Sequence, residues 1–170
     1  MSYIVRQAKG EDAESFIILM KELSVFGYNN ALKMSASKDE AIINLADDKS
    51  FKIKNFAVWL SNLNKEKKQM VFLAVDNSTN EAVGFISADI NENKHSMVKK
   101  DGYIADVYIR EAHRKKGLAD LLLKSILTWF KKMNVKHITL NVDVNNDNAI
   151  KLYSKMGFRK IMYKMSLYQG

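Results

Sequence analysis

The N-terminal third of the chain combines one weak strand pattern with helical patterns. Residues 2–7 alternate between apolar and polar positions and predict a first strand. Residues 11–23 carry apolar side chains at helical spacing, and their acidic first turn favours a helix. Residues 25–34 contain a glycine and two consecutive asparagines, a composition that predicts a turn-like segment.

Two further helices are predicted before the pattern changes. Ser37 and Glu40 have the spacing of a capping box at the start of the first. The second, over residues 54–64, places Phe56 and Trp59 on one side. Both aromatic residues either pack on a sheet or line an acceptor site.

The pattern then becomes extended. Residues 70–75 and 81–90 are apolar-rich runs joined by a polar turn, and together they predict a hairpin. Residues 91–102 are polar and predict a longer loop, and residues 103–109 predict a further strand.

The C-terminal third alternates helix and strand. Apolar residues at helical spacing predict an amphipathic helix; they are Leu118, Leu121, Leu122, Ile126, Phe130 and Met133. Residues 137–142 predict a strand and residues 146–156 a helix, which Gly157 ends as a left-handed C-cap. Residues 158–168 predict a last strand, whose exposed edge would suit a homodimer.

This order of elements predicts an α+β fold. We expect one domain over residues 1–170, with a mixed, mostly antiparallel sheet of six or seven strands flanked by helices.

Composition narrows the possible chemistry. The chain has no cysteine, which excludes disulfides, cysteine-based zinc sites and a cysteine nucleophile. The histidines His95, His113 and His137 lack ligand spacing, so no metal site is expected. No secretory signal begins the sequence and no apolar run approaches the ~20 residues that span a bilayer, so we expect a cytoplasmic protein with no membrane partner.

The net charge of +8 has two interpretations, an anionic ligand or a solvated lysine-rich surface. The lysines are dispersed along the chain and form no stripe, so we expect no nucleic-acid partner. Only residues 110–116 combine charge with a turn. Residues 114–120 then lead from a strand into a helix start, where amides and cations suit a phosphate.

Two motifs decide which phosphate. Arg114-x-x-Gly117-x-Ala119 resembles the pyrophosphate signature of the GCN5-related N-acetyltransferase (GNAT) superfamily. The run from Asn146 through Leu152-Tyr153 to Gly157-Phe158 resembles that family's closing motif. Arg6-Gln7-Ala8 with Asp12, and residues 81–86, resemble its opening segment and third strand.

The resemblance implies an acetyl-CoA-dependent N-acetyltransferase that moves an acetyl group directly to a primary amine of a small molecule or peptide. The backbone of Val107, Tyr108 and Ile109 would pair with the pantetheine arm. The Val107 N–H would stabilise the oxyanion, and Tyr153 would protonate the leaving thiolate. The implied donor-binding residues are Val107, Tyr108, Ile109, Arg114, Lys115, Lys116, Gly117, Leu118, Ala119, Asp120, Asn146 and Tyr153.

Three of these side chains have a second interpretation. Arg114 either binds phosphate or braces the turn. Asn146 either contacts the donor or caps its helix. Tyr153 is either the acid or a core aromatic.

The chain departs from the family at the expected general base. Many relatives have a glutamate where Ala105 stands. Asp106 points to the opposite face in a regular strand, although a bulge would change this. Other candidates are His95, Asp101, Glu111 and His113. The base is therefore unassigned, and a non-catalytic CoA-binding module of the same fold is the alternative function.

Overall fold

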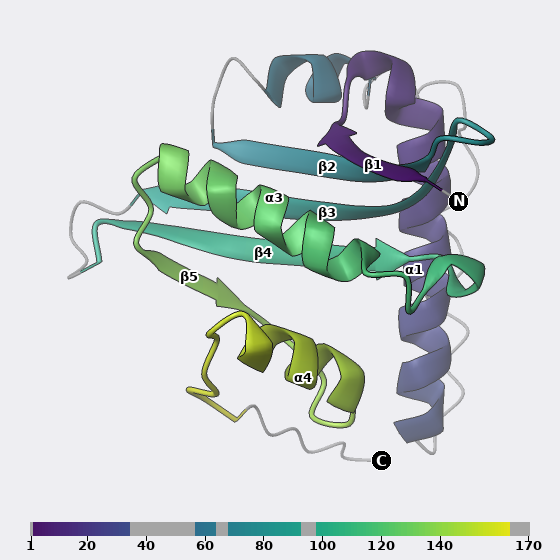
Figure 1. The fold of residues 1–170 in the computed structure, drawn as a ribbon. Helices are drawn as coiled ribbons and strands as arrows, with labels where there is room; N and C mark the ends of the chain where they lie inside the picture. Colours follow the sequence, from purple (N-terminus) through teal and green to yellow (C-terminus); the bar gives the residue numbers. More distant parts are fainter. Residues whose placement is uncertain (1, 35–56, 64–67, 93–97, 164–170) are drawn as a thin grey trace, which may run out of the picture. The chain divides into compact units, whose positions relative to one another are not determined.

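A sheet of five strands organises the part of the chain that the computed structural model describes, residues 2–34, 57–63, 68–92 and 98–163 (Figure 1). In sheet order the strands are β1 (Tyr3–Gln7), β2 (Gln69–Asp76), β3 (Glu81–Glu92), β4 (Lys100–Ile109) and β5 (His137–Leu140). Neighbours from β1 to β4 are antiparallel, whereas β4 and β5 are parallel. The α+β class is confirmed, with five strands among the described residues instead of six or seven.

Helices connect and cover these strands. They are η1 (Gly10–Asp12), α1 (Ala13–Met34), η3 (Glu111–His113), α3 (Leu118–Lys132) and α4 (Asp147–Lys155). Residues 57–63 are also helical. The chain divides into two compact units, Met1–Leu140 and Asn141–Gly170, so α4 belongs to the second. The expectation of a single domain stays a prediction.

Helix α3 makes the parallel pairing of β4 and β5 possible, because parallel neighbours need a crossover connection. It lies on one face of the sheet (Figure 1). Its buried residues are Leu118, Leu122, Leu123, Ile126, Trp129 and Phe130. A Cβ at Gly102 of β4 would lie 2.5 Å from the Phe130 ring, so this glycine lets the helix approach the strand closely.

Helix α1 and residues 57–63 cover the other face (Figure 1). Phe16 of α1 packs edge-on against Phe85 of β3, with ring centroids 5.1 Å apart. Leu19, Leu60 and Leu63 are buried in the same cluster. The two faces of β3 are therefore buried against different helices.

The hairpin prediction is confirmed, since β2 and β3 are antiparallel neighbours. The predicted loop is shorter at both ends, because β3 continues to Glu92 and β4 begins at Lys100.

The predicted turn over residues 25–34 is wrong, because α1 continues to Met34. A glycine inside a helix costs only about 1 kcal/mol relative to alanine. Contacts with the rest of the fold offset that cost: Glu22 is ion-paired with Arg110, and Arg114 lies over the Phe26 ring. The predicted helix after Ser37 lies outside the described residues.

Two expectations in the C-terminal third are also corrected. Residues 158–163 form no strand, and the rest of the predicted last strand lies outside the described residues. Leu121 was expected on the buried face of α3 but is 43% exposed. It lines an open hollow of about 600 Å³ between α3 and the strands β1 and β2, where no described element covers it.

An ion pair joins β1 to the start of α1. Arg6 donates to both carboxylate oxygens of Asp12 at 2.7 Å, and the Lys9 amide donates to one of them at 2.8 Å. Burial favours the protonated carboxyl, but these hydrogen bonds outweigh it and hold the pKa of Asp12 below its ordinary value of 3.8.

Replacing Asp12 by Asn removes a charge partner from this mostly buried pair. We expect the free energy of unfolding at pH 7 to fall by about 1–3 kcal/mol. Because the folded pKa is depressed, the contribution is complete above pH 3.8 and is lost as the pH falls through the folded value. Urea unfolding at pH 7 and pH 3 measures it, and the difference from the native sequence should shrink at pH 3. Glu11→Gln, an exposed change next to it, is the control; a loss for D12N that is equal at both pH values would contradict the assignment.

Candidate functional site

The pairing of β4 with β5 stops partway along β4. The parallel register runs from Asp101 to Ile104 opposite His137 to Leu140, where β5 ends. Residues 105–109 of β4 continue along β3, and their other edge extends beyond the end of β5. The first unit thus has a strand edge next to the turn that follows β4.

Hydrogen-bond alternation shows which backbone groups point to this edge. The Arg110 amide donates to the Val83 carbonyl at 2.9 Å, so this pair is hydrogen bonded to β3. In an antiparallel pair such residues alternate with residues whose N–H and C=O point away. By the observed register, Tyr108 bonds to β3 whereas Val107 and Ile109 face the open edge. Of the three residues predicted to pair with a ligand, Val107 and Ile109 direct backbone groups to this edge, and Tyr108 directs its groups to β3.

A β-bulge lies at Ala105. Ser87 is opposite Asp106 and Ala88 is opposite Ile104, so Ala105 is an extra residue in β4. The bulge brings Asp106 to the α1 side of the sheet, where Ser87 Oγ donates to its Oδ2 at 2.9 Å. The sequence predicts that Asp106 changes face only if the strand has a bulge, and the structure has that bulge.

Gly84 of β3 holds β4 close at the same place. A Cβ at this position would lie 2.6 Å from the Tyr108 carbonyl oxygen and 3.2 Å from the Ile109 Cα. Both are backbone atoms, so a larger residue would push the strand away. The position of the open edge therefore depends on this glycine.

The turn after β4 leads directly into the N-terminus of α3. Lys115 and Gly117 both have left-handed backbone, with φ of 59° and 78°. Apart from its two chain neighbours, no described residue has an atom within 4 Å of a Cβ built on Gly117, so the described part of the chain leaves space above the turn. The first helical bond runs from the Leu121 amide to the Gly117 carbonyl. The amides of Leu118 and Ala119 precede it and suit an anion at the helix N-terminus.

The predicted residues of this turn contribute in different ways. The Leu118 side chain is buried in the core, so only its amide is available to a ligand. Asp120 lies in the first turn of α3, where its charge complements the helix dipole.

Arg114 braces the turn in this structure. Its Nε donates to the Ile109 carbonyl at 2.9 Å, and its guanidinium lies 5.0 Å from the centroid of the Phe26 ring. Arg110 forms ion pairs with Glu22 of α1 and with Glu81. Both arginines thus fasten the end of β4, and the bracing interpretation of Arg114 describes its observed contacts.

Lys116, predicted as a donor-binding residue, directs its ammonium to β1. Its Nζ donates to the hydroxyl of Tyr3 at 3.1 Å. Tyr3 has no motif around it, and its role at the turn was not predicted from the sequence.

A polar row follows the α1 side of the sheet. Trp59 Nε1 donates to Gln69 Oε1 at 2.8 Å, and Gln69 Nε2 donates to Asp89 Oδ1 at 2.6 Å. Asp89 lies two residues beyond Ser87 on β3 and so shares its face. Trp59 also stacks on Phe16, with ring centroids 6.0 Å apart, which favours its packing role. The row was not predicted, because it depends on strand register.

Burial raises the pKa of Tyr108, and a hydrogen bond with Glu22 adds to the rise. The tyrosine therefore stays neutral at physiological pH.

In the second unit, Asn146 caps α4. Its Oδ1 accepts from the Ala149 amide at 3.1 Å. Burial raises the pKa of Tyr153, so its hydroxyl keeps its proton at neutral pH. Gly157 has φ of 92° and ends the helix with bonds from Gly157 to Ser154 and from Phe158 to Tyr153, which confirms the predicted C-cap.

Neither a metal-ligating cluster nor a membrane-spanning helix occurs in the described part of the chain. No group of three or more metal-ligating side chains occurs there. Its helices are also too short or too polar to cross a membrane.

Comparison with known proteins identifies the family. The model of the acetyltransferase (GNAT) family matches residues 38–158. An N-alpha-acetyltransferase of Saccharolobus solfataricus is 35% identical over 105 residues, 57% of this chain and 60% of that protein. N-alpha-acetyltransferase 30 of Saccharomyces cerevisiae is 28% identical over 107 residues, 60% of each chain. The match thus spans about 60% of the length of these two relatives.

A solved structure shows the same fold. AAC(6')-Iy in complex with the bisubstrate analog CoA-S-monomethyl-acetylneamine has a TM-score of 0.69 and 14% identity, covering 100% of this chain and 99% of that one. The match of the family model over residues 38–158 shows that the chain belongs to the acetyltransferase (GNAT) family.

Proposed function

We propose that this chain is an acetyl-CoA-dependent N-acetyltransferase that transfers the acetyl group directly to a primary amine. The observation that carries the proposal is the edge of β4 beyond the end of β5, which adjoins the glycine turn. An extended amide-bearing ligand can pair with such an edge as an added strand. Its phosphates would then reach the N-terminus of α3.

The pyrophosphate is the group that the turn suits. The amides of residues 115–120 and the positive end of α3 attract an anion, and the open space over Gly117 leaves room for it. Lys115 and Lys116 add positive charge at the same turn. The pantetheine arm would bind the N–H and C=O of Val107 and the N–H of Ile109, since the Ile109 carbonyl already accepts from Arg114 Nε.

Val107 would supply the electrostatic part of catalysis. Its N–H faces the edge, so it can donate to the carbonyl oxygen of the thioester as negative charge develops there.

Asp106 is the general base of this proposal. It neighbours Val107 in β4, and the bulge places its carboxylate on the α1 side of the sheet. Ser87 holds one carboxylate oxygen, which leaves the second for a proton. Asp106 takes a proton from the ammonium form of the acceptor, and the free amine then attacks the thioester carbon. As the carbon–sulfur bond breaks, Tyr153 protonates the thiolate and the amide nitrogen gives its second proton back to the Tyr153 oxygen. Asp106 would thus supply the carboxylate that Ala105 lacks.

Tyr153 is the proposed acid, which returns a proton to the leaving thiolate. Burial keeps its hydroxyl protonated at neutral pH, which this role requires. In this proposal, Asn146 contacts the donor through groups other than the Oδ1 atom that caps α4.

The acceptor class to test first is a free α-amine of a peptide. Two relatives found by sequence are named N-alpha-acetyltransferases, and each aligns over more than half of this chain. Polyamines, amino acids and aminoglycosides complete the panel. The assay measures CoA release from acetyl-CoA, with CoA binding measured separately by calorimetry. Binding without transfer to any amine would favour the non-catalytic alternative, and no binding would reject both.

Replacing Asp106 by Asn should lower kcat/KM by about 10²-fold or more at pH 7, because the proton of the amine loses its acceptor. The loss should shrink as the pH rises, because a larger fraction of the acceptor is then already a free amine. Steady-state kinetics from pH 7 to 9.5 measures both effects. Glu92→Gln makes the same chemical change at an exposed end of β3 and should retain activity. A pH-independent loss for D106N would contradict its role as base.

Replacing Tyr153 by Phe should lower kcat by about 10²-fold while the dissociation constant of CoA stays within about twofold. The ring, and with it the contact to Phe158, is retained. Equal losses in CoA affinity and turnover would indicate a packing role, and unchanged turnover would remove Tyr153 from the mechanism.

A further inference from the structure

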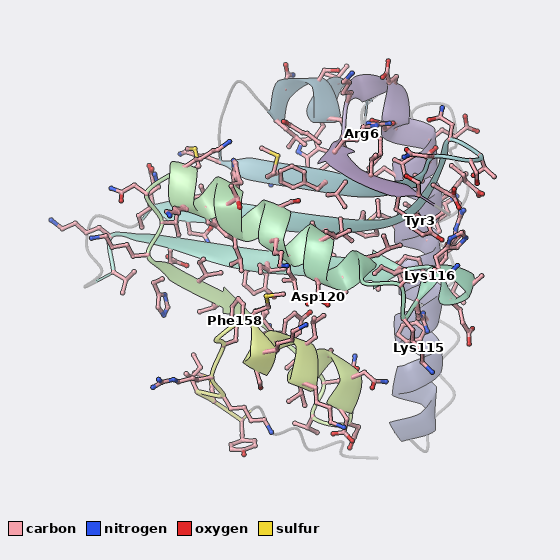
Figure 2. The ribbon with its side chains drawn as sticks, in the orientation of Figure 1. Tyr3, Arg6, Lys115, Lys116, Asp120 and Phe158 are labelled. Atoms are coloured by element: carbon pink, nitrogen blue, oxygen red, sulfur yellow. The ribbon has the colours of Figure 1, made fainter. Side chains whose placement is uncertain are left out.

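The first residue of β1 reaches the donor turn from the other end of the sequence. The Tyr3 hydroxyl lies 3.1 Å from His113 Nδ1 and 3.1 Å from Lys116 Nζ. Figure 2 shows Tyr3 and Lys116 at the same end of the sheet. One hydroxyl group thus joins two residues of the segment that leads into α3.

Each contact is supported by a second one. The rings of Tyr3 and His113 meet edge to face, with centroids 5.9 Å apart. The Lys116 ammonium lies 5.7 Å from the centroid of the Tyr3 ring, within the range of a cation–π contact. The phenol therefore holds both residues through its ring as well as its hydroxyl.

The same ring nitrogen of His113 has a second neighbour. Asp76, at the end of β2, lies opposite Tyr3 in the sheet register, and its Oδ2 is 4.0 Å from His113 Nδ1. Its other oxygen accepts from the amide and hydroxyl of Ser78, which fixes the carboxylate. The paired ends of β1 and β2 thus form a rigid support for the turn.

The turn itself needs such a support. Lys115 is a non-glycine residue with φ of 59°, a conformation that costs about 1 kcal/mol or more, and Gly117 has φ of 78°. Lys116 lies between these two residues. A contact to the Lys116 side chain therefore acts on the residue that joins the two left-handed positions.

We propose that Tyr3 is a positioning residue for the donor: through Lys116 and His113 it fixes the turn in the conformation that directs the amides of residues 115–120 to the pyrophosphate. The inference rests on the proposed function. Tyr3 touches neither reacting group, so its effect should appear in donor affinity and leave the chemical step unchanged.

The first test replaces Tyr3 by Phe, which keeps the ring and removes the two hydroxyl contacts. We expect the dissociation constant of CoA, measured by calorimetry, to rise about three- to tenfold, as the loss of one or two ordinary hydrogen bonds predicts. At saturating acetyl-CoA, kcat should stay within about twofold. Tyr163→Phe makes the same chemical change at an exposed site, 76% accessible, and should leave both quantities unchanged.

The second test asks whether Tyr3 acts through Lys116. In a double-mutant cycle with Lys116→Met, Tyr3→Phe should weaken CoA binding less than it does in the native sequence, since their shared contact is already lost. A purely structural role for Tyr3 would instead give additive effects on CoA affinity, even if thermal stability falls.

Failure of this inference differs from failure of the proposed function. Native-like CoA affinity in Tyr3→Phe, additive effects in the cycle, or a fall in kcat at saturating donor would each overturn the positioning role. Absence of CoA binding by the native chain would instead reject the proposed function.

Discussion

The candidate site depends on one constraint, the point where β4 and β5 stop pairing. Parallel neighbours must be joined by a crossover, and α3 supplies it. Because β5 ends opposite Ile104, the same strand that is fully paired in its first half presents Val107 and Ile109 at an edge in its second half. The crossover helix begins at Leu118, one short turn after the end of that edge at Ile109. A strand edge and a helix N-terminus therefore adjoin each other as a result of topology.

The sequence predicted the parts of this arrangement that local patterns encode. The hairpin, the amphipathic helix after Gly117 and the left-handed Gly157 follow from spacing and from glycine at the right positions. The family was predicted from two motifs and confirmed by the match over residues 38–158. The wrong turn over residues 25–34 shows the limit of local composition, because contacts of Arg110 and Arg114 with α1 stabilise the helix there.

The parts that could not be predicted all depend on register or on distant contacts. A bulge at Ala105 cannot be read from a strand pattern, yet it decides the face on which Asp106 lies. Arg114 matched the motif, but the motif does not reveal that its side chain contacts Phe26, which lies nearly ninety residues earlier in the sequence. Tyr3 has no motif at all. The fold brings these residues close to partners that are distant in the sequence, and a single sequence does not show such proximity.

The attachment of both arginines to α1 has a thermodynamic consequence. Arg110 pairs with Glu22, and Arg114 lies over Phe26, so the segment between β4 and α3 cannot shift without changing contacts made by α1. If a ligand that displaces α1 at these residues changes donor affinity by some factor, linkage requires the donor to change that ligand's affinity by the same factor. The final occupancy of the two sites would then be the same whichever molecule is added first. The size of the coupling factor would measure how strongly the two arginine contacts link α1 to the donor turn.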